Sequence, residues 1–159
     1  MVVHRVICDS RSKLREVCWG RMSQPSYLTD PTFVRSVLAA SEDCIKVLSL
    51  DGRLTFMSEG GMRVMEVSDF NAIAGCPWPD FWLDAGNTEA VNAIANAAQG
   101  RSSRFVGKAN TMKGNTRWWD VQVSPILDAD DQPKAILSVS RDITELKRAQ
   151  DRPICWRRK

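Results

Sequence analysis

The segment from Thr116 to Ile126 constrains the fold most, because the character of its side chains alternates. Trp119, Val121 and Val123 form an apolar set at every second position. The alternate positions carry Trp118, Asp120 and Gln122. A period of two places successive side chains on opposite faces of a β-strand. A strand with one apolar face is typical of an antiparallel sheet that is covered on one side. The chain must therefore supply both further strands and a cover.

Four more strands are predicted around this one. Residues 102–110 and 134–142 flank it, each separated from it by a turn rich in Gly, Asn, Asp or Pro. Residues 45–48 and 53–57 form an earlier pair joined by Asp51-Gly52, the dipeptide that most strongly favours a tight hairpin.

Helical patterns occupy the remaining parts of the central region. Asp30-Pro31 is a good start for a helix ending near Ser41, and residues 58–100 contain several short helices and a longer one from Asn87. A short charged helix, Thr144–Gln150, follows the last strand. The order predicts an α+β fold: a five-stranded antiparallel sheet with a helical crossover on one face, flanked by N- and C-terminal helices.

The 159 residues are 43% hydrophobic and 26% charged, which is the composition of one globular domain. Their charge is uneven. Residues 1–21 carry five basic and two acidic side chains, residues 147–159 carry six and one, and residues 22–146 carry eleven and sixteen. Because the central part is acidic, we expect no nucleic-acid partner.

The chain is accordingly divided into three parts. No run of 18 apolar residues occurs, and basic residues interrupt the N-terminal apolar stretch, so neither a transmembrane helix nor a secretory signal is predicted. We expect a cytoplasmic protein with no membrane partner. The predicted parts are a basic irregular extension (1–29), a folded domain (30–150) and a basic tail (151–159).

The scarcity of histidine excludes several chemistries. The chain has one histidine, His4, and five cysteines without a CxxC spacing. Ser-His-Asp hydrolysis, multi-histidine metal sites and a disulfide framework are therefore not expected. The sequence also lacks a P-loop and a GxGxxG motif, so we expect no enzymatic activity, no catalytic residues and no metal.

Four segments carry a resemblance to a known family. They are DGRLTFMSEGGMRVM (51–65), GCPWPDFW (75–82), KGNTRWWDVQVSPILDADDQP (113–133) and SVSRDITELKRAQ (138–150). In this order and spacing they resemble the PAS domain, of the kind found in bacterial sensory histidine kinases. One departure is Ser58-Glu59, where the family usually has Asn. No phospho-acceptor helix or ATP-binding segment occurs in the chain.

The resemblance implies a stand-alone sensory or interaction module in bacterial signal transduction, without a kinase on this chain. It would sense a small ligand or bind a protein partner, with a histidine kinase or response regulator as the expected partner in a two-component system. The alternatives are a PAS domain that serves only dimerisation or structure, and a flavin-binding photosensor or redox sensor.

The resemblance also implies a transmission site at Asp142, Ile143 and Thr144. There the last strand meets the exit helix, and in the family this junction passes a change in the sheet to an output helix. A carboxylate at this place also acts as an ordinary helix cap, worth about 1 kcal/mol. Both interpretations use the same hydrogen bonds.

A ligand pocket is predicted between sheet and helices, unless the same side chains form an ordinary packed core. The candidate lining residues are Phe56, Met65, Phe70, Phe81, Trp82, Ile94, Trp119 and Val121. The resemblance implies that a haem-binding member would carry an axial histidine on the long helix. Residues 86–100, where that helix is expected, contain no histidine, so we expect no haem. The flavin-binding relatives have N-C-R-F-L-Q, whereas Cys76 lies in AGCPWPDFW, so we expect no flavin. An unidentified small ligand remains the expectation.

Trp118 is predicted to point away from the apolar face, where a large ring needs a cover. Residues 31–41 of the same chain or of a second copy would supply it, through Phe33, Val34 and Val37. We expect a homodimer with this surface at its interface.

Overall fold

The computed structural model describes residues 5–8, 14–17 and 30–151. The chain divides into two compact units after Arg35. In the first unit, β1 (Arg5–Cys8) pairs antiparallel with β2 (Leu14–Val17), where sequence analysis expects an irregular extension. His4 and, apart from Asp151, the predicted tail lie outside the described residues.

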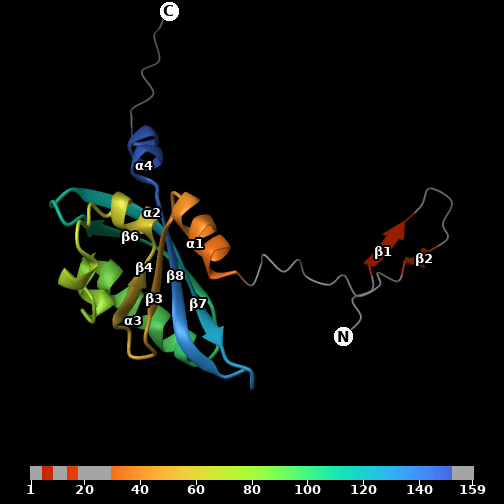
Figure 1. Cartoon of the computed structure of the whole chain (residues 1–159). Coiled ribbons are helices and arrows are strands. Elements are labelled where there is room, and N and C mark those ends of the chain that lie inside the picture. Colours follow the sequence, from red (N-terminus) through yellow and green to blue (C-terminus); the bar gives the residue numbers. More distant parts are fainter. Residues whose placement is uncertain (1–4, 9–13, 18–29, 152–159) are drawn as a thin grey trace, which may run out of the picture. The chain divides into compact units, whose positions relative to one another are not determined.

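The second unit is built on a six-stranded sheet with the order β4-β3-β8-β7-β6-β5, in which all neighbours are antiparallel (Figure 1). The strands are β3 (Cys44–Leu48), β4 (Leu54–Met57), β5 (Trp82–Leu83), β6 (Ser103–Asn110), β7 (Thr116–Leu127) and β8 (Pro133–Asp142). The five predicted strands are all present. The sixth, β5, is a two-residue strand at the edge.

Some of the helices begin at a capping residue whose side chain satisfies a free N–H group of the first turn. The helices are α1 (Pro31–Ala40), α2 (Glu59–Val64), the 3-10 helices η2 (Phe70–Ala72) and η3 (Trp78–Phe81), α3 (Ala85–Ala98) and α4 (Thr144–Gln150). Asp30 accepts a hydrogen bond from Thr32 N, and Ser58 accepts one from Gly61 N at 3.0 Å. Ser58 thus supplies the cap at the place where Asn is usual. No helix in the described ranges is long and apolar enough to cross a membrane.

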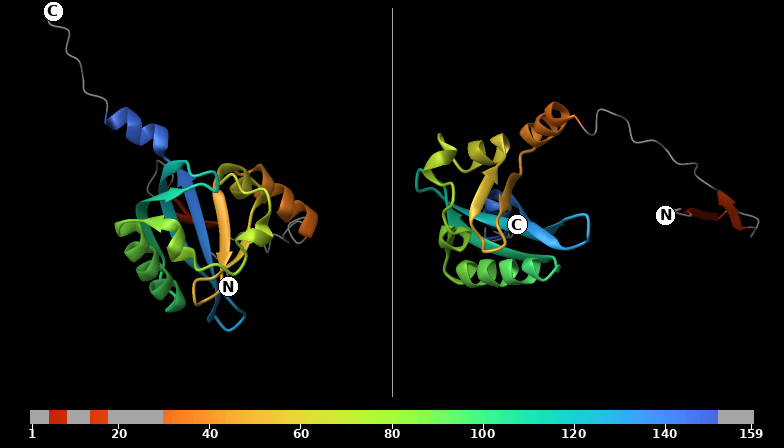
Figure 2. Two further views of the ribbon diagram at one scale, coloured as in Figure 1. Left: turned by 90° about the vertical axis from the view of Figure 1, so that its left-hand side faces the viewer. Right: turned by 60° about the horizontal axis from the view of Figure 1, so that its bottom comes forward.

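The crossover helix α3 contacts β6, β7 and β8 (Figure 2). Its buried residues are Gly86, Ala90, Ala93 and Ala97. The apolar pattern of this helix suggests a different inner face, with Val91, Ile94, Ala95 and Ala98. That prediction is wrong: Val91 is exposed, and Ile94 is only partly buried. Small side chains are buried because they let the helix lie close to the sheet.

The core lies between the inner face of the sheet and the helical crossover. Trp119, Val121 and Val123 of β7 are fully buried, as their alternation predicts. Trp78 of η3 packs edge-to-face on Trp82, with 5.4 Å between ring centroids. At the C-terminal end of β8, α4 projects beyond the sheet, as Figure 1 and the left view of Figure 2 show.

Candidate functional site

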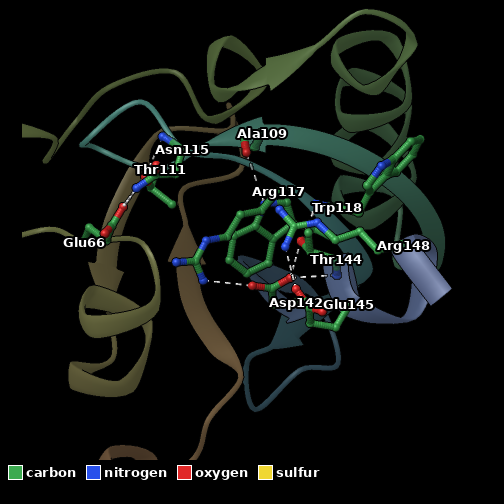
Figure 3. A network of polar contacts seen from close by, with 11 residues as sticks. Glu66, Ala109, Thr111, Asn115, Arg117, Trp118, Asp142, Thr144, Glu145 and Arg148 are labelled. Atoms are coloured by element: carbon green, nitrogen blue, oxygen red, sulfur yellow. Dashed lines mark hydrogen bonds and ion pairs between the residues drawn. The ribbon is translucent and has the colours of Figure 1, made fainter.

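The junction between β8 and α4 is hydrogen-bonded to β7 (Figure 3). Thr144 Oγ1 accepts a hydrogen bond from Trp118 N at 3.0 Å and donates one to Asp142 Oδ1 at 2.5 Å. The same carboxylate oxygen accepts from Thr144 N at 2.9 Å, and Ile143 N donates to Trp118 O at 2.9 Å. The three predicted transmission residues are therefore brought together on the end of β7.

Asp142 is held as a carboxylate at this junction. Its second oxygen accepts a hydrogen bond from Arg117 Nη1 at 2.8 Å. Partial burial opposes ionisation, but the hydrogen bonds from Thr144 and Arg117 outweigh it, so the pKa of Asp142 is lowered from its ordinary value. The negative charge also suits the adjacent N-terminus of α4.

Trp118 has a cover that sequence analysis did not anticipate. Lys108 Nζ lies 4.8 Å from the centroid of the indole ring, and Lys147 Nζ of α4 lies 5.4 Å from it. An ammonium group over an indole face is attracted by the ring quadrupole. The side chain thus adds a second connection between β7 and α4, beside the hydrogen bonds of its backbone.

An apolar cavity of about 30 Å³ lies between the sheet and the crossover. Four of the eight candidate residues line it: Met65, Phe81, Trp82 and Trp119. Lys46, Asn110 and Ser140 supply polar lining that sequence analysis missed. The volume is far below the ~300 Å³ at which pockets for drug-sized ligands begin, so a large ring does not fit this conformation.

The other four candidates do not line the cavity. Phe56 is 41% exposed, because the β3–β4 register shifts between Val47 and Leu48, and Leu54 and Met57, three residues apart, both turn inward.

The remaining three lie elsewhere in the core. Phe70 of η2 and Ile94 of α3 are partly buried against it, with Ile94 packed onto Gly52 of the hairpin turn. Val121 is fully buried but does not reach the cavity.

Glu66 forms a second polar cluster, which sequence analysis did not predict (Figure 3). Its Oε2 accepts hydrogen bonds from Thr111 Oγ1 and, at 2.7 Å, from Asn115 Nδ2. These bonds lower the pKa of Glu66. Next to it, Met112 N donates to Met65 O at 3.0 Å. Because Met65 and Met112 both line the cavity, the cluster holds together two sides of its wall.

The cysteines and acidic residues form no metal site among the described residues. Cys44 is a buried free thiol, and Cys76 is a partly exposed free thiol outside the cavity lining. The absence of haem and flavin stays a prediction.

The residues predicted for a dimer surface fall on both units. Val34 and Val37 of α1 are exposed, Phe33 is half-buried, and Trp118 lies under its two lysines. The outer face of the sheet beside Trp118 carries ion pairs between Arg104 and Asp120 and between Arg141 and Asp43. The homodimer stays a prediction.

Comparison with known proteins identifies this fold. A family model described as PAS fold matches residues 38–148. A PAS domain of an HTR-like protein from Haloarcula marismortui is 18% identical, with a TM-score of 0.59, 70% of this chain covered and 90% of that one. A PAS domain from Colwellia psychrerythraea is 20% identical, with a TM-score of 0.60 and coverages of 72% and 97%.

A more distant solved structure covers a larger share of the chain. An RNA-binding light-oxygen-voltage receptor is 14% identical, with a TM-score of 0.66, 94% of this chain covered and 42% of that one. At these identities the likeness concerns the fold. The search of curated proteins found no match.

Proposed function

The chain belongs to the PAS family, whose members are general sensory and signalling modules, and we propose that it is a sensor in which α4 follows the state of the core through Asp142, Ile143 and Thr144. PAS domains are in general non-catalytic, and the proposed role involves no reaction on this chain.

One observation carries this proposal: Thr144 Oγ1 is hydrogen-bonded both to the backbone of β7 and to Asp142. The first turn of α4 is therefore attached to two adjacent central strands. β7 also bears Trp119, which lines the cavity. A change in the cavity that shifts β7 relative to β8 would alter these hydrogen bonds and so change the position or order of α4.

The change in α4 is proposed to be recognised by a protein partner that binds this helix. Leu146 of α4 is 57% exposed, which leaves an apolar side chain next to the junction for a contact. We extend the proposal to a bacterial two-component system, with a histidine kinase or response regulator as partner and a homodimer as the working form. The four motif segments support this extension.

Hydrogen exchange tests the coupling at the junction. Thr144→Val removes the hydroxyl while keeping the shape. We expect the amides of residues 144–150, and the Trp118 amide that loses its acceptor, to exchange at least tenfold faster, with the other sheet amides unchanged. Thr116→Val is the matched control. Thr116 is the first residue of β7, and its hydroxyl donates a hydrogen bond to Asn110 of β6. Equal loosening of sheet and α4 would instead favour a domain with a purely structural junction.

A further inference from the structure

Lys46 is a buried basic residue on the inner face of the sheet. It lies on β3 between Cys44 and Leu48, all three on the inner face of the sheet, and its side chain is 3% exposed. Its Nζ donates to Cys44 Sγ at 2.8 Å. Among the described residues, no carboxylate lies within ion-pair distance of this ammonium group. Burying an ammonium costs several kcal/mol unless an anion or hydrogen-bond acceptors compensate it.

Three further buried polar groups lack partners. Ser138 Oγ, Ser140 Oγ and Trp82 Nε1 make no hydrogen bond within the described residues. Ser138 is paired with Lys46 across β3 and β8 but does not line the cavity. Native proteins leave few buried polar atoms unsatisfied, and those few often mark a place for a bound group. Lys46, Ser140 and Trp82 come from three different strands and line the same cavity. All three carry N–H or O–H donors, and none is negatively charged.

The remaining lining of the cavity is mostly apolar. Trp78, Phe81 and Trp119 supply aromatic walls, while Met57 and Met65 supply flexible apolar ones. The exposed side chains Asn110 and Met112 form part of the lining and mark its solvent side. The cavity of about 30 Å³ is small, but thioether side chains repack at low cost. Such a site accepts a short apolar chain better than a rigid ring.

We propose that this cavity binds a small monocarboxylate with a short apolar tail, its carboxylate on Lys46 and its tail among the Trp and Met side chains. The inference rests on the proposed sensory function and names its ligand class. A neutral ligand would leave the ammonium uncompensated, and a cation would be repelled by it. The carboxylate oxygens can also accept from Trp82 Nε1 and Ser140 Oγ, which satisfies all three groups at once.

A titration with matched probes tests the proposal. Acetate, butyrate and hexanoate are compared with the primary alcohols of equal length, at constant ionic strength in chloride, by tryptophan fluorescence. Three tryptophans line the cavity, so their emission reports occupancy. We expect at least one carboxylate to bind saturably and at least tenfold more tightly than its alcohol. Equal binding of the two series, or no saturable carboxylate binding, would overturn the proposal.

Substitution of the cation provides the second arm. Lys46→Met keeps the length of the side chain and removes its charge, and we expect at least tenfold weaker carboxylate binding with alcohol binding retained. Lys134→Met, at an exposed position of β8, is the matched control and should bind like the wild type. Unchanged carboxylate affinity in Lys46→Met contradicts the proposal. The variant should fold, because removing an uncompensated buried charge does not lower stability.

If Lys46→Met does not fold, two milder variants test the carboxylate proposal instead. Trp82→Phe and Ser140→Ala should each weaken carboxylate binding and spare alcohol binding, and unchanged carboxylate affinity in both overturns the proposal. The exchange test on Thr144→Val uses ligand-free protein, so failure of carboxylate binding and failure of the junction are distinguishable. If both proposals hold, saturating carboxylate changes the exchange of α4 amides in the wild type and leaves it unchanged in Thr144→Val.

Discussion

Arg117 and Asp142 face each other across the end of the sheet, with 2.8 Å between Arg117 Nη1 and Asp142 Oδ2. The two side chains are 30% and 27% exposed, so solvent screens the pair only in part. The other carboxylate oxygen is occupied by Thr144. Asp142 therefore connects an arginine of β7 with the first turn of α4, and a change at this carboxylate acts on both.

Asp142→Ala should release α4 before it unfolds the domain. The loss of a partly exposed capping carboxylate predicts a destabilisation of about 1 kcal/mol. Exchange of the amides of residues 144–150 should accelerate much more than that of the central strands. Urea unfolding and hydrogen exchange measure the two effects. Glu145→Ala is the control, because Glu145 is exposed and its ion pair is with Arg148 of the same helix. A uniform acceleration that follows global stability would show a simple structural cap.

The contribution of Asp142 should depend on pH in a defined direction. Its folded pKa is below its ordinary value, so its charge stabilises the fold above the unfolded pKa of about 4. This stabilisation is lost as the pH falls through the folded pKa. The difference in unfolding free energy between wild type and Asp142→Asn should be constant from about pH 6 to pH 8 and shrink below about pH 4. Other carboxylates cancel in this difference. A difference that grows in acid would contradict the assignment.

Lys147 and Trp118 should be energetically coupled. A partly exposed cation–π contact is worth about 0.5–1 kcal/mol. A double-mutant cycle of Lys147→Ala and Trp118→Leu, followed by urea unfolding, should give a coupling energy near the lower value. The matched cycle replaces Lys147→Ala by Arg148→Ala, whose side chain pairs with Glu145 in the same helix. Equal coupling in both cycles would show a general charge effect on α4.

Much of the fold was predictable because its signals are local. Alternation in β7, the Asp51-Gly52 turn and the cap at Asp30 each depend on residues close in the chain. The predictions fail where a tertiary contact overrides the pattern. The bulge opposite Val47 turns Phe56 outward, and close packing buries Ala90 and Ala93 of α3 in place of Val91. Hydropathy assigns the larger side chain to the core, whereas the space between helix and sheet admits the smaller one.

The candidate site was predictable only in part, for a related reason. The junction residues are adjacent in sequence, so a motif identifies them. Lys46 was missed because charged side chains are rarely buried. Its position, two residues from both Cys44 and Leu48, nevertheless places it on the same inner face as these two residues. Glu66 accepts a hydrogen bond from Thr111, which is 45 residues away in the sequence, and no local pattern indicates such a contact.

Gly60→Ala should destabilise the chain more than a glycine substitution at an open position. A Cβ at Gly60 would lie 2.1 Å from the backbone oxygen of Ser41, which cannot yield as a side chain does. The clash predicts a loss of about 1–3 kcal/mol, against the better helix propensity of alanine. Gly100→Ala is the control: its φ of +79° is strained for alanine, at about 1 kcal/mol, but no atom lies within contact distance. Thermal unfolding of both variants measures the difference, and an unchanged Gly60→Ala would disprove the close approach.

Glu66→Ala should loosen the solvent side of the cavity. The substitution removes the acceptor of Thr111 and Asn115, and with it the side-chain contact that supports the Met112–Met65 hydrogen bond. We expect amides of residues 111–115 to exchange severalfold faster, because that turn then loses its long-range side-chain hydrogen bonds and keeps only the backbone bond from Met112 to Met65 among those described. Tryptophan emission should be quenched more readily by acrylamide, since Trp78 and Trp119 line the cavity. Glu89→Ala, at an exposed position of α3, should change neither signal. Faster exchange without increased quenching would mean that the cluster secures the turn and does not control access to the cavity.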